Sequence, residues 1–311
     1  MQIFSLKNGI CPVPEVPSGT VMIFGFFDGV HRGHTELIGK ATEYARESGL
    51  MTCVWSFSSM PKSEKLLTTN DEKTGILAEI GIDYVVYEEF PSIKDTPFAD
   101  FYEKYVTGKF APAAVFCGFN FRFGRNAEGT ADDLKALAEK NGVRGFVVGA
   151  YEADGDVVSS SRIRSLIAEG NVGEAAKLLG RPYAVNSCIV HGKEIGRRLG
   201  FATINQRIPP EKTVPKFGVY VTRAVFGNGN AFHGISNIGN RPTVNSDTED
   251  VTLETHILDW DKNAYGEYVK LELMEFVRGE KKFESPEILA QQIGKDAKAA
   301  RDYFALPAEK D

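Results

Sequence analysis

The sequence predicts two domains: an α/β domain with a doubly wound parallel sheet, then a small antiparallel β-barrel domain with a C-terminal helix. Three observations support this prediction. The chain has 311 residues, which fits about two domains of roughly 150 residues each. Strand-like and helix-like segments alternate over residues 1–182, as in a parallel sheet covered on both faces. Over residues 183–311, strand-like segments and turns follow one another directly, as in a small barrel.

Apolar segments mark the expected strands of the first domain, and segments with helical spacing lie between them. The expected strands cover residues 21–26, 50–57, 84–87, 113–117 and 145–149. After the first strand, apolar residues recur at helical spacing, namely Leu37, Ile38, Ala41, Tyr44 and Ala45. Further helices are expected over residues 71–80, 98–106 and 130–140. A helix also opens at SSSRIRSLI, and the domain boundary is expected near Gly180-Arg181-Pro182.

Turn signals separate the expected strands of the second domain. GNGN (residues 227–230) lies between two strand-like runs and is expected to form a hairpin turn. Near the end of the chain, Ser285-Pro286-Glu287 has the form of an N-cap followed by proline at the first helical position. A final helix is therefore expected to run to about Phe304.

The composition is that of an ordinary globular protein. Apolar residues make up 42% of the chain, and every apolar run is far shorter than the ~20 residues that span a bilayer. The first residues, MQIFSLKNGICPVPEVP, lack the pattern of a signal peptide. The four cysteines are scattered, which is typical of a reducing compartment, so a cytoplasmic location is expected. The net charge of −6, from 36 basic and 42 acidic residues, argues against a general nucleic-acid binder.

The stretch VMIFGFFDGVHRGH places two histidines where a strand gives way to a helix. In a parallel sheet the carboxyl ends of the strands face the crevice in which ligands bind, and a helix N-terminus there attracts anions. Gly25, Gly29 and Gly33 would let the backbone approach a phosphate, and His31 and His34 would donate hydrogen bonds to its oxygens. The spacing fits neither a dinucleotide fingerprint nor a P-loop. Two alternatives stay open: the histidine pair could bind a metal, or His34 could cap the helix.

Two further stretches of the first domain place arginines where a phosphate could bind. GFNFRFGRNAEG (residues 118–129) sets Arg122 and Arg125 among three phenylalanines at a strand end. That mixture suits a planar ligand carrying phosphates, although the loop could instead pack its rings onto the core. SSSRIRSLI puts Arg162 and Arg164 into the first turn of a helix, where cations oppose the helix dipole unless an anion offsets them. A bound triphosphate would supply that anion.

The second domain offers a glycine-bearing loop between strands, GKEIGRRLGFATINQR (residues 192–207). Its amides could hold a phosphate in a backbone nest, or the loop could be an ordinary turn. Thr203 and Asn205 alternate along an extended stretch and would point the same way, and their oxygens suit magnesium. In VTLETHILDWD, a strand-like stretch further along, Glu254 is either a surface residue or a functional carboxylate.

These stretches together carry a resemblance to a known family. FDGVHRGH resembles the HxGH signature of nucleotidyltransferases, in the form found in bacterial bifunctional riboflavin kinase/FAD synthetases. GFNFRFG is similar to that family's G-x-[DN]-F-R-F-G, and SSSRIR is similar to its SSTxIR motif. GRRLGFATIN resembles the riboflavin kinase signature G-R-x-x-G-F-P-T-A-N. The motifs occur in the family's order and span roughly residues 20–303.

The resemblance implies an enzyme of FAD biosynthesis that uses ATP and Mg²⁺. The second domain would be a riboflavin kinase, which converts riboflavin and ATP to FMN and ADP. The first would be a nucleotidyltransferase domain, an FMN adenylyltransferase that converts FMN and a second ATP to FAD and pyrophosphate. Riboflavin, FMN and ATP would be the partners, with no nucleic acid and no membrane, and the oligomeric state is left open.

The resemblance also implies roles for individual residues. The ATP triphosphate in the first domain would be held and neutralised by His31, His34, Asn120, Ser160, Ser161, Arg162 and Arg164. Further contacts to flavin or nucleotide would come from Gly25, Phe26, Asp28, Gly33 and Arg122 in the first domain, and from Gly192, Gly200 and Arg241 in the second. Glu254 would be the catalytic base of the kinase, and magnesium would be held by Thr203 and Asn205.

Two departures from the family pattern bear on activity. Met60, in SSMPKSEK, stands where the family has a histidine. The absence of that histidine could weaken adenylyl transfer, and Lys62 and Lys65 are candidates to take over its role. Ala202 and Ile204 replace the proline and alanine of the kinase signature, which could loosen the loop and reduce affinity for ATP. The alternatives are therefore a chain that keeps only one of the two activities, or a flavin-binding protein without turnover.

Overall fold

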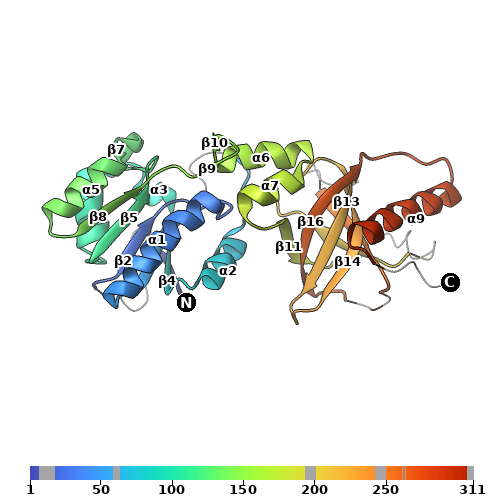
Figure 1. Cartoon of the computed structure of the whole chain (residues 1–311), viewed down its shortest axis with the longest axis horizontal. Helices are drawn as coiled ribbons and strands as arrows, with labels where there is room; N and C mark the ends of the chain where they lie inside the picture. The colour runs from blue at the N-terminus through green and yellow to red at the C-terminus, as the bar shows by residue number, and fades with distance from the viewer. Residues whose placement is uncertain are drawn as a thin grey trace. The chain divides into compact units, whose positions relative to one another are not determined.

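The computed structural model of the chain describes residues 1–6, 18–58, 64–192, 201–241, 250–260, 262 and 264–306. Contacts within the chain divide it into two compact units, residues 1–160 and 161–311 (Figure 1). The six-stranded sheet of the first unit is parallel and that of the second unit is antiparallel, as the sequence predicts. The domain boundary expected at residue 182 falls inside the second unit and stays a prediction.

Six parallel strands form the sheet of the first unit, in the order β1-β4-β3-β2-β5-β8. The strands are β1 (Gln2–Leu6), β2 (Val21–Phe24), β3 (Thr52–Phe57), β4 (Tyr84–Glu88), β5 (Ala114–Gly118) and β8 (Arg144–Val148). All but β1 correspond to expected strands. β1 has no counterpart among them; it lies at the edge of the sheet and pairs with β4, Gln2 opposite Tyr84.

Alternate residues of these strands build an apolar core on each face of the sheet. Val21 and Ile23 belong to the core that includes α1 (Arg32–Ser48) and α2 (Asn70–Ile80). Met22 and Phe24 belong to the opposite core, built with α4 (Phe98–Phe101), a π-helix (Tyr102–Thr107) and α5 (Ala131–Lys140). Figure 1 shows α1 in blue lying along the sheet beside β2. The sheet is therefore doubly wound, as predicted.

Most helix ends follow local signals, but one helix differs from the prediction. Gly81 ends α2 with φ 93°, in the left-handed conformation that glycine adopts most easily. The single helix expected over residues 98–106 is instead the four-residue α4 followed by the π-helix, in which Gly108 N–H donates to the Glu103 carbonyl at 2.8 Å. Three aromatic residues at this wider turn are buried in the core: Phe101, Tyr102 and Tyr105.

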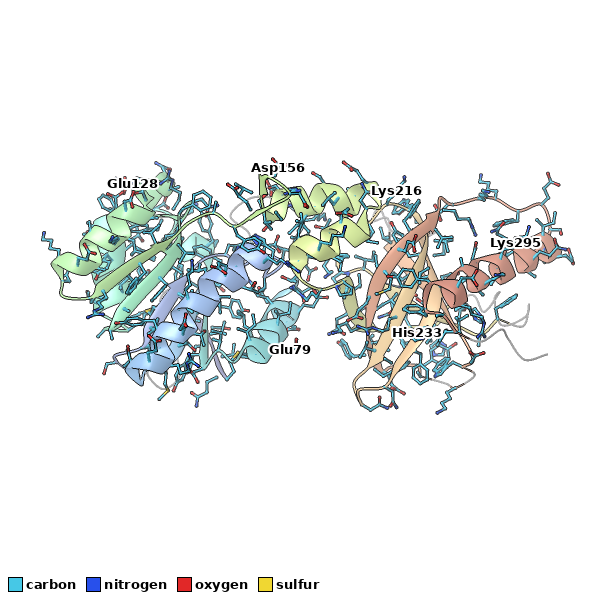
Figure 2. The ribbon with its side chains drawn as sticks, viewed as in Figure 1. Glu79, Glu128, Asp156, Lys216, His233 and Lys295 are labelled. Carbon is cyan, nitrogen blue, oxygen red and sulfur yellow. The ribbon has the colours of Figure 1, made fainter. Side chains whose placement is uncertain are left out.

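Short elements complete the first unit. α3 (Phe90–Ile93) follows β4, and there are two small hairpins, β6 (Arg122–Phe123) with β7 (Gly129–Thr130) and β9 (Glu152–Ala153) with β10 (Asp156–Val157). The carboxylate of Glu128, labelled in Figure 2, accepts a hydrogen bond from Phe98 N–H at 3.0 Å. This contact ties the loop between β6 and β7 to the start of α4.

The second unit begins with helices and continues as an antiparallel sheet. α6 (Ser160–Glu169) starts at the last residue of the first unit, and α7 (Val172–Leu179) follows. The sheet order is β11-β16-β13-β14-β15-β12. Its strands are β11 (Tyr183–Cys188), β12 (Thr203–Arg207), β13 (Gly218–Phe226), β14 (Ala231–Arg241), β15 (Asp250–Ile257) and β16 (Tyr268–Arg278). Past β11, Val190 N–H donates to the Asn205 carbonyl of β12 at 2.8 Å, so the two edges meet and the sheet closes toward a barrel.

The hairpin turn and the final helix of this unit agree with their sequence signals. GNGN joins β13 to β14. α9 (Pro286–Tyr303) has Ser285 as its N-cap, whose hydroxyl accepts from Ile288 N–H at 3.4 Å. α9 packs on β13 and β14 (Figure 1). His233 of β14, labelled in Figure 2, stacks on the ring of Phe304 just past α9, with 3.8 Å between centroids.

Candidate functional site

The first candidate site lies at the carboxyl ends of β2 and β5, where the winding of the sheet reverses. From β2 the chain moves outward through β3 to β4, and β5 then lies on the other side of β2. Ligands of open parallel sheets bind at such reversals. Residues 25–34, here called the histidine turn, follow β2, and GFNFRFG begins at the end of β5. The topology therefore brings both predicted motifs to the same edge of the sheet.

The two histidines of this turn lie against each other at the start of α1. Their rings stack with 3.6 Å between centroids and 18° between planes, and the ring of His34 also meets Phe27 edge-on at 5.2 Å. His31, not His34, holds the N-cap position. The first turn of α1 contains no acidic residue, so it presents imidazoles and backbone N–H groups at the positive end of the helix. This arrangement can bind an anion such as a phosphate.

Two glycines of the histidine turn make room for neighbouring rings. A Cβ on Gly25 would lie 2.6 Å from the ring of Phe27, and one on Gly33 would lie 3.2 Å from the ring of His31. The sequence predicts that these glycines let the backbone approach a phosphate. The structure adds a second reason for them, because a side chain at either position would displace a ring of the turn.

Backbone strain and a buried carboxylate fix the turn between these glycines. Phe27 and Val30 have φ of 55° and 39°, a left-handed conformation that costs a non-glycine residue about 1–3 kcal/mol and is common at functional sites. Asp28, 2% exposed, accepts from the N–H groups of Leu67 and Thr68 at 2.8 and 3.3 Å. Asp28, predicted to contact the ligand, thus holds the turn to the segment before α2.

The start of α6 reaches the histidine turn through Ser160, whose hydroxyl donates to the Asp28 carbonyl at 2.9 Å. This hydrogen bond joins two motifs that are 132 residues apart in the sequence. The residues after Ser160 belong to the second unit, where Arg164 donates to the Ser161 hydroxyl at 3.2 Å and the side chains of Arg162 and Arg164 are half-buried. The roles of these residues toward a triphosphate stay predictions.

An aromatic cavity of about 240 Å³ lies in the first unit, on the face of the sheet opposite α1. Its walls come from the end of β3, from α3 and α4, and from the loop after β5: Trp55, Phe57, Phe90, Ile93, Lys94, Phe101, Phe121, Arg122, Phe123, Gly124, Asn126 and Ala127. Six aromatic side chains and the Arg122 guanidinium suit a flat ligand with a negatively charged group. Asn120, in the turn just before Phe121, is exposed.

Two residues beside this site were not singled out from the sequence. Trp55 lines the aromatic cavity, and its buried Nε1 has no hydrogen-bond partner among the described residues. Lys73 of α2 is 2% exposed, and burial lowers its pKa to about 8, an effect that the nearby Asp28 carboxylate partly offsets. One sequence signal could have found Lys73: it precedes the buried Leu77 by four residues, so both lie on the inward face of the helix.

The second candidate site lies on one face of the antiparallel sheet. Thr203 pairs with His256 and Asn205 with Glu254 across β12 and β15, and residues directly opposite each other share a face of the sheet. A cavity of about 260 Å³ borders this face. It is lined by Thr203, Val219, Ile235, Asn237, Glu254, His256, Arg278, Glu280, Lys281, Phe283, Leu289, Ile293 and Asp296. Glu254 is exposed and borders the cavity, so its carboxylate can reach a ligand there.

The oxygen pair predicted to hold magnesium lies on the same face. Thr203 borders the cavity, and Asn205, 6% exposed, packs so closely against Gly192 that a Cβ on the glycine would overlap the Asn205 amide. A hydroxyl and an amide oxygen fit magnesium, which favours oxygen ligands and keeps several waters. Within the described ranges there is no group of three or more His, Cys, Asp or Glu residues that could hold a metal.

A histidine on this face constrains the segment that leads to Thr203. The Nδ1 atom of His256 lies 3.0 Å from the Ala202 carbonyl, and its ring meets Phe201 edge-on at 5.1 Å. With Nδ1 protonated, His256 donates to that carbonyl. Ala202 is the position at which the family pattern has proline, so the contact restrains a segment that the substitution was expected to loosen.

Met60, Lys62 and Gly200 fall outside the described residues. Arg241 ends β14, where its backbone pairs with Asp250. Lys65, the other candidate to compensate for Met60, is exposed.

Sequence comparison relates the chain to known enzymes. The sequence model of the FAD synthetase family matches residues 13–162, and that of riboflavin kinase matches residues 179–304. A bifunctional riboflavin kinase/FMN adenylyltransferase of Listeria monocytogenes is 34% identical, over 92% of this chain and 92% of its own. A protein of the same description from Escherichia coli (strain K12) is also 34% identical, over 97% of this chain and 98% of its own.

A solved structure has the same fold over nearly the whole chain. It is described as a macrolide-efflux protein from Streptococcus pneumoniae, and it matches with a TM-score of 0.86 at 28% identity, covering 96% of this chain and 99% of that one. In the part of the chain that the structure describes, no helix is long and apolar enough to cross a membrane. Because both family models match in order and relatives at 34% identity cover almost the full length, the chain belongs to the family of bifunctional riboflavin kinase/FMN adenylyltransferases.

Proposed function

We propose that the first unit binds FMN and ATP at the histidine turn and the aromatic cavity, and that the second unit binds riboflavin and ATP at the cavity bordered by Glu254. The chain is an enzyme of FAD biosynthesis, with riboflavin kinase and FMN adenylyltransferase activities. One observation supports the two sites most strongly: in each unit, a cavity large enough for part of a flavin borders residues suited to phosphate or magnesium.

For adenylyl transfer, a phosphate oxygen of FMN attacks the α-phosphorus of ATP. The bond from the α-phosphorus to the oxygen that bridges to the β-phosphate breaks, and pyrophosphate leaves. His31 and His34, at the start of α1, donate hydrogen bonds to phosphoryl oxygens on which charge builds up. Asn120 and Ser160 hold the triphosphate, and the flavin ring lies in the aromatic cavity with Arg122 at its border. No covalent intermediate is needed, so positioning and charge stabilisation supply the catalysis.

For riboflavin phosphorylation, the Glu254 carboxylate accepts the proton of the ribityl 5′-hydroxyl while that oxygen attacks the γ-phosphorus of ATP, and ADP leaves. The position of Glu254 at the cavity supports this role. Thr203 and Asn205 hold magnesium, which neutralises phosphate charge when bound. Gly192, Gly200 and Arg241 complete the proposed contacts to nucleotide or flavin.

We also propose a cytoplasmic location. The described cysteines Cys53, Cys117 and Cys188 are free thiols, as is usual in a reducing compartment. The ATP that both reactions consume would be supplied there.

Incubation of the full chain with riboflavin, ATP and magnesium, followed by chromatography, tests both steps at once. We expect FMN to form first and FAD to accumulate, and we expect EDTA to stop both. FMN without FAD would mean that only the kinase is retained. FAD from added FMN, without any product from riboflavin, would mean that only the adenylyltransferase is retained. Flavin binding without ATP consumption would identify a binding protein without turnover.

A further inference from the structure

Lys73 is a buried lysine beside the histidine turn, and the reactions described above leave it without a role. α2 begins behind Thr69 with a capping box closed by Glu72, so Lys73 is the fourth residue of the helix. It lies on the inward face together with Leu77, and the two residues are 2% and 0% exposed. A buried charge costs free energy unless it is paired and hydrogen-bonded, so the contacts of Lys73 indicate what it does.

The ammonium group of Lys73 joins the ends of two strands. It donates to the Phe26 carbonyl at 3.1 Å, to the Ser56 hydroxyl at 3.2 Å and to the Phe57 carbonyl at 3.3 Å. An ammonium has three N–H donors, and these three acceptors match them in number. The Ser56 hydroxyl in turn donates to the Phe26 carbonyl at 2.9 Å. The nitrogen also lies over the rings of Phe26 and Tyr87, 4.7 and 5.1 Å from their centroids.

The two carbonyls held by Lys73 lead directly into the proposed adenylyltransferase site. Phe26 belongs to the histidine turn and precedes Phe27, whose backbone is strained at φ 55°. Phe57 is a wall of the aromatic cavity. One side chain therefore sets the position of the phosphate-binding turn relative to the flavin cavity. Spacing matters there, because a misplacement of about 1 Å can lower a rate by about 10²-fold.

We propose that Lys73 is a positioning residue of the FMN adenylyltransferase site, where its ammonium group holds the histidine turn and the Phe57 wall of the aromatic cavity at the spacing that adenylyl transfer requires. The proposal rests on the function proposed for the first unit. Lys73 is buried away from the substrates and acts through Phe26 and Phe57.

The charge on Lys73 provides a readout that a purely structural role would not give. Its pKa, ordinarily 10.5, is lowered by burial to about 8. The ionisable groups that face it are Asp28, whose charge raises the pKa of Lys73, and Tyr87, whose own pKa is raised by burial and by Asp71. Above pH about 8 the amine keeps only two N–H donors, so one of its three acceptors loses a hydrogen bond. We therefore expect adenylyl transfer to decline as the pH rises through about 8.

Two variants of Lys73 and one matched control test the proposal in the full chain. Lys73→Met keeps the length of the side chain and removes the donors, while the guanidinium of Lys73→Arg stays charged at every pH of the assay. Lys40→Met alters an exposed lysine of α1 that pairs with Glu36 of the same helix at the surface. FAD formation from FMN and ATP, and FMN formation from riboflavin and ATP, are measured for each protein across the pH range.

We expect Lys73→Met to lower the kcat of FAD formation at least about tenfold. Riboflavin phosphorylation by that variant, and both activities of Lys40→Met, should stay within about twofold of the unmodified protein. Lys73→Arg should recover part of the rate, and its FAD formation should not decline above pH 8 as that of the unmodified protein does.

Three results would overturn the proposal. The first is a Lys73→Met protein, folded by circular dichroism, that forms FAD at the unmodified rate; this would leave the proposed function intact. The second result applies if Lys73→Met does not fold: it is a Lys73→Arg protein whose rate of FAD formation declines above pH 8 as much as that of the unmodified protein. The third is an unmodified protein that phosphorylates riboflavin and makes no FAD, which would refute the function proposed for the first unit together with the role of Lys73.

Discussion

Asp296→Ala should weaken the anchor between α9 and the sheet of the second unit. Asp296 accepts hydrogen bonds from the Arg278 guanidinium at 2.6, 3.1 and 3.2 Å, and from the Gln292 amide at 2.8 Å. The side chains of Asp296 and Arg278 are 4% and 16% exposed. Removal of the carboxylate would leave the guanidinium largely buried without its partner. Breaking a buried ion pair in this way costs about 3–5 kcal/mol of unfolding free energy.

This loss should appear both in the melting temperature and in the kinase step. In a domain of this size each kcal/mol lowers the Tm by about 2–4 °C, so the lower bound of about 3 kcal/mol corresponds to roughly 6–12 °C. Arg278 also begins the segment that carries Glu280, Lys281 and Phe283 to the cavity. We therefore expect the KM for riboflavin to rise, while FAD formation from added FMN stays unchanged.

Differential scanning calorimetry and riboflavin kinase kinetics measure the two effects. Asp302→Ala is the matched control, because it removes an exposed ion pair with Lys298 on the same helix. The side chains of Lys298 and Asp302 are 74% and 66% exposed. Exposed pairs at this spacing contribute only about 0.3–0.5 kcal/mol. Equal Tm shifts in the two variants, or an unchanged Tm in Asp296→Ala, would show that the buried pair does not anchor α9.

Other contacts give outcomes that are simpler to measure. Burial raises the pKa of the Cys53 and Cys117 thiols to about 12, so iodoacetamide should leave both unmodified in the folded protein; a peptide map with either one alkylated would contradict this. His256→Phe removes the contact with the Ala202 carbonyl and should raise the KM for ATP in riboflavin phosphorylation, so an unchanged KM would speak against that role. The pKa of Lys73 is lowered on folding, so the stability of the unmodified protein relative to Lys73→Met should rise by up to about 1.4 kcal/mol per pH unit between pH 8 and 10. A difference independent of pH would contradict the shift.

The elements that could be predicted are those whose signals are local. Gly81 ends α2 and Ser285 caps α9 through contacts made within a few residues, so the sequence alone placed both ends. β1 could not be found in this way. It is a short edge strand with an exposed Ile3, and its pairing depends on Tyr84 of β4, far away in the sequence.

The residues of the candidate sites also fall into two groups: those that a local sequence motif reveals, and those whose role depends on tertiary packing. His31 and His34 were found because a compact motif carries them, and the structure stacks their rings. Two of the three acceptors of Lys73 are backbone carbonyls of residues 47 and 16 positions away, and a backbone carbonyl has no sequence signature. The aromatic cavity likewise combines the end of β3, α3, α4 and the loop after β5. The cavity forms only when tertiary packing brings these segments together.

We propose that two separate sites, linked by FMN that one releases and the other binds, make FAD. Mixing the His34→Ala and Glu254→Gln proteins with riboflavin, ATP and magnesium separates the two sites in one experiment. We expect His34→Ala alone to stop at FMN, Glu254→Gln alone to make no FMN from riboflavin while still converting added FMN, and the mixture to make FAD. FAD from His34→Ala alone, or a mixture of folded proteins that accumulates FMN without converting it, would show that FAD is not made at two separate sites linked by free FMN.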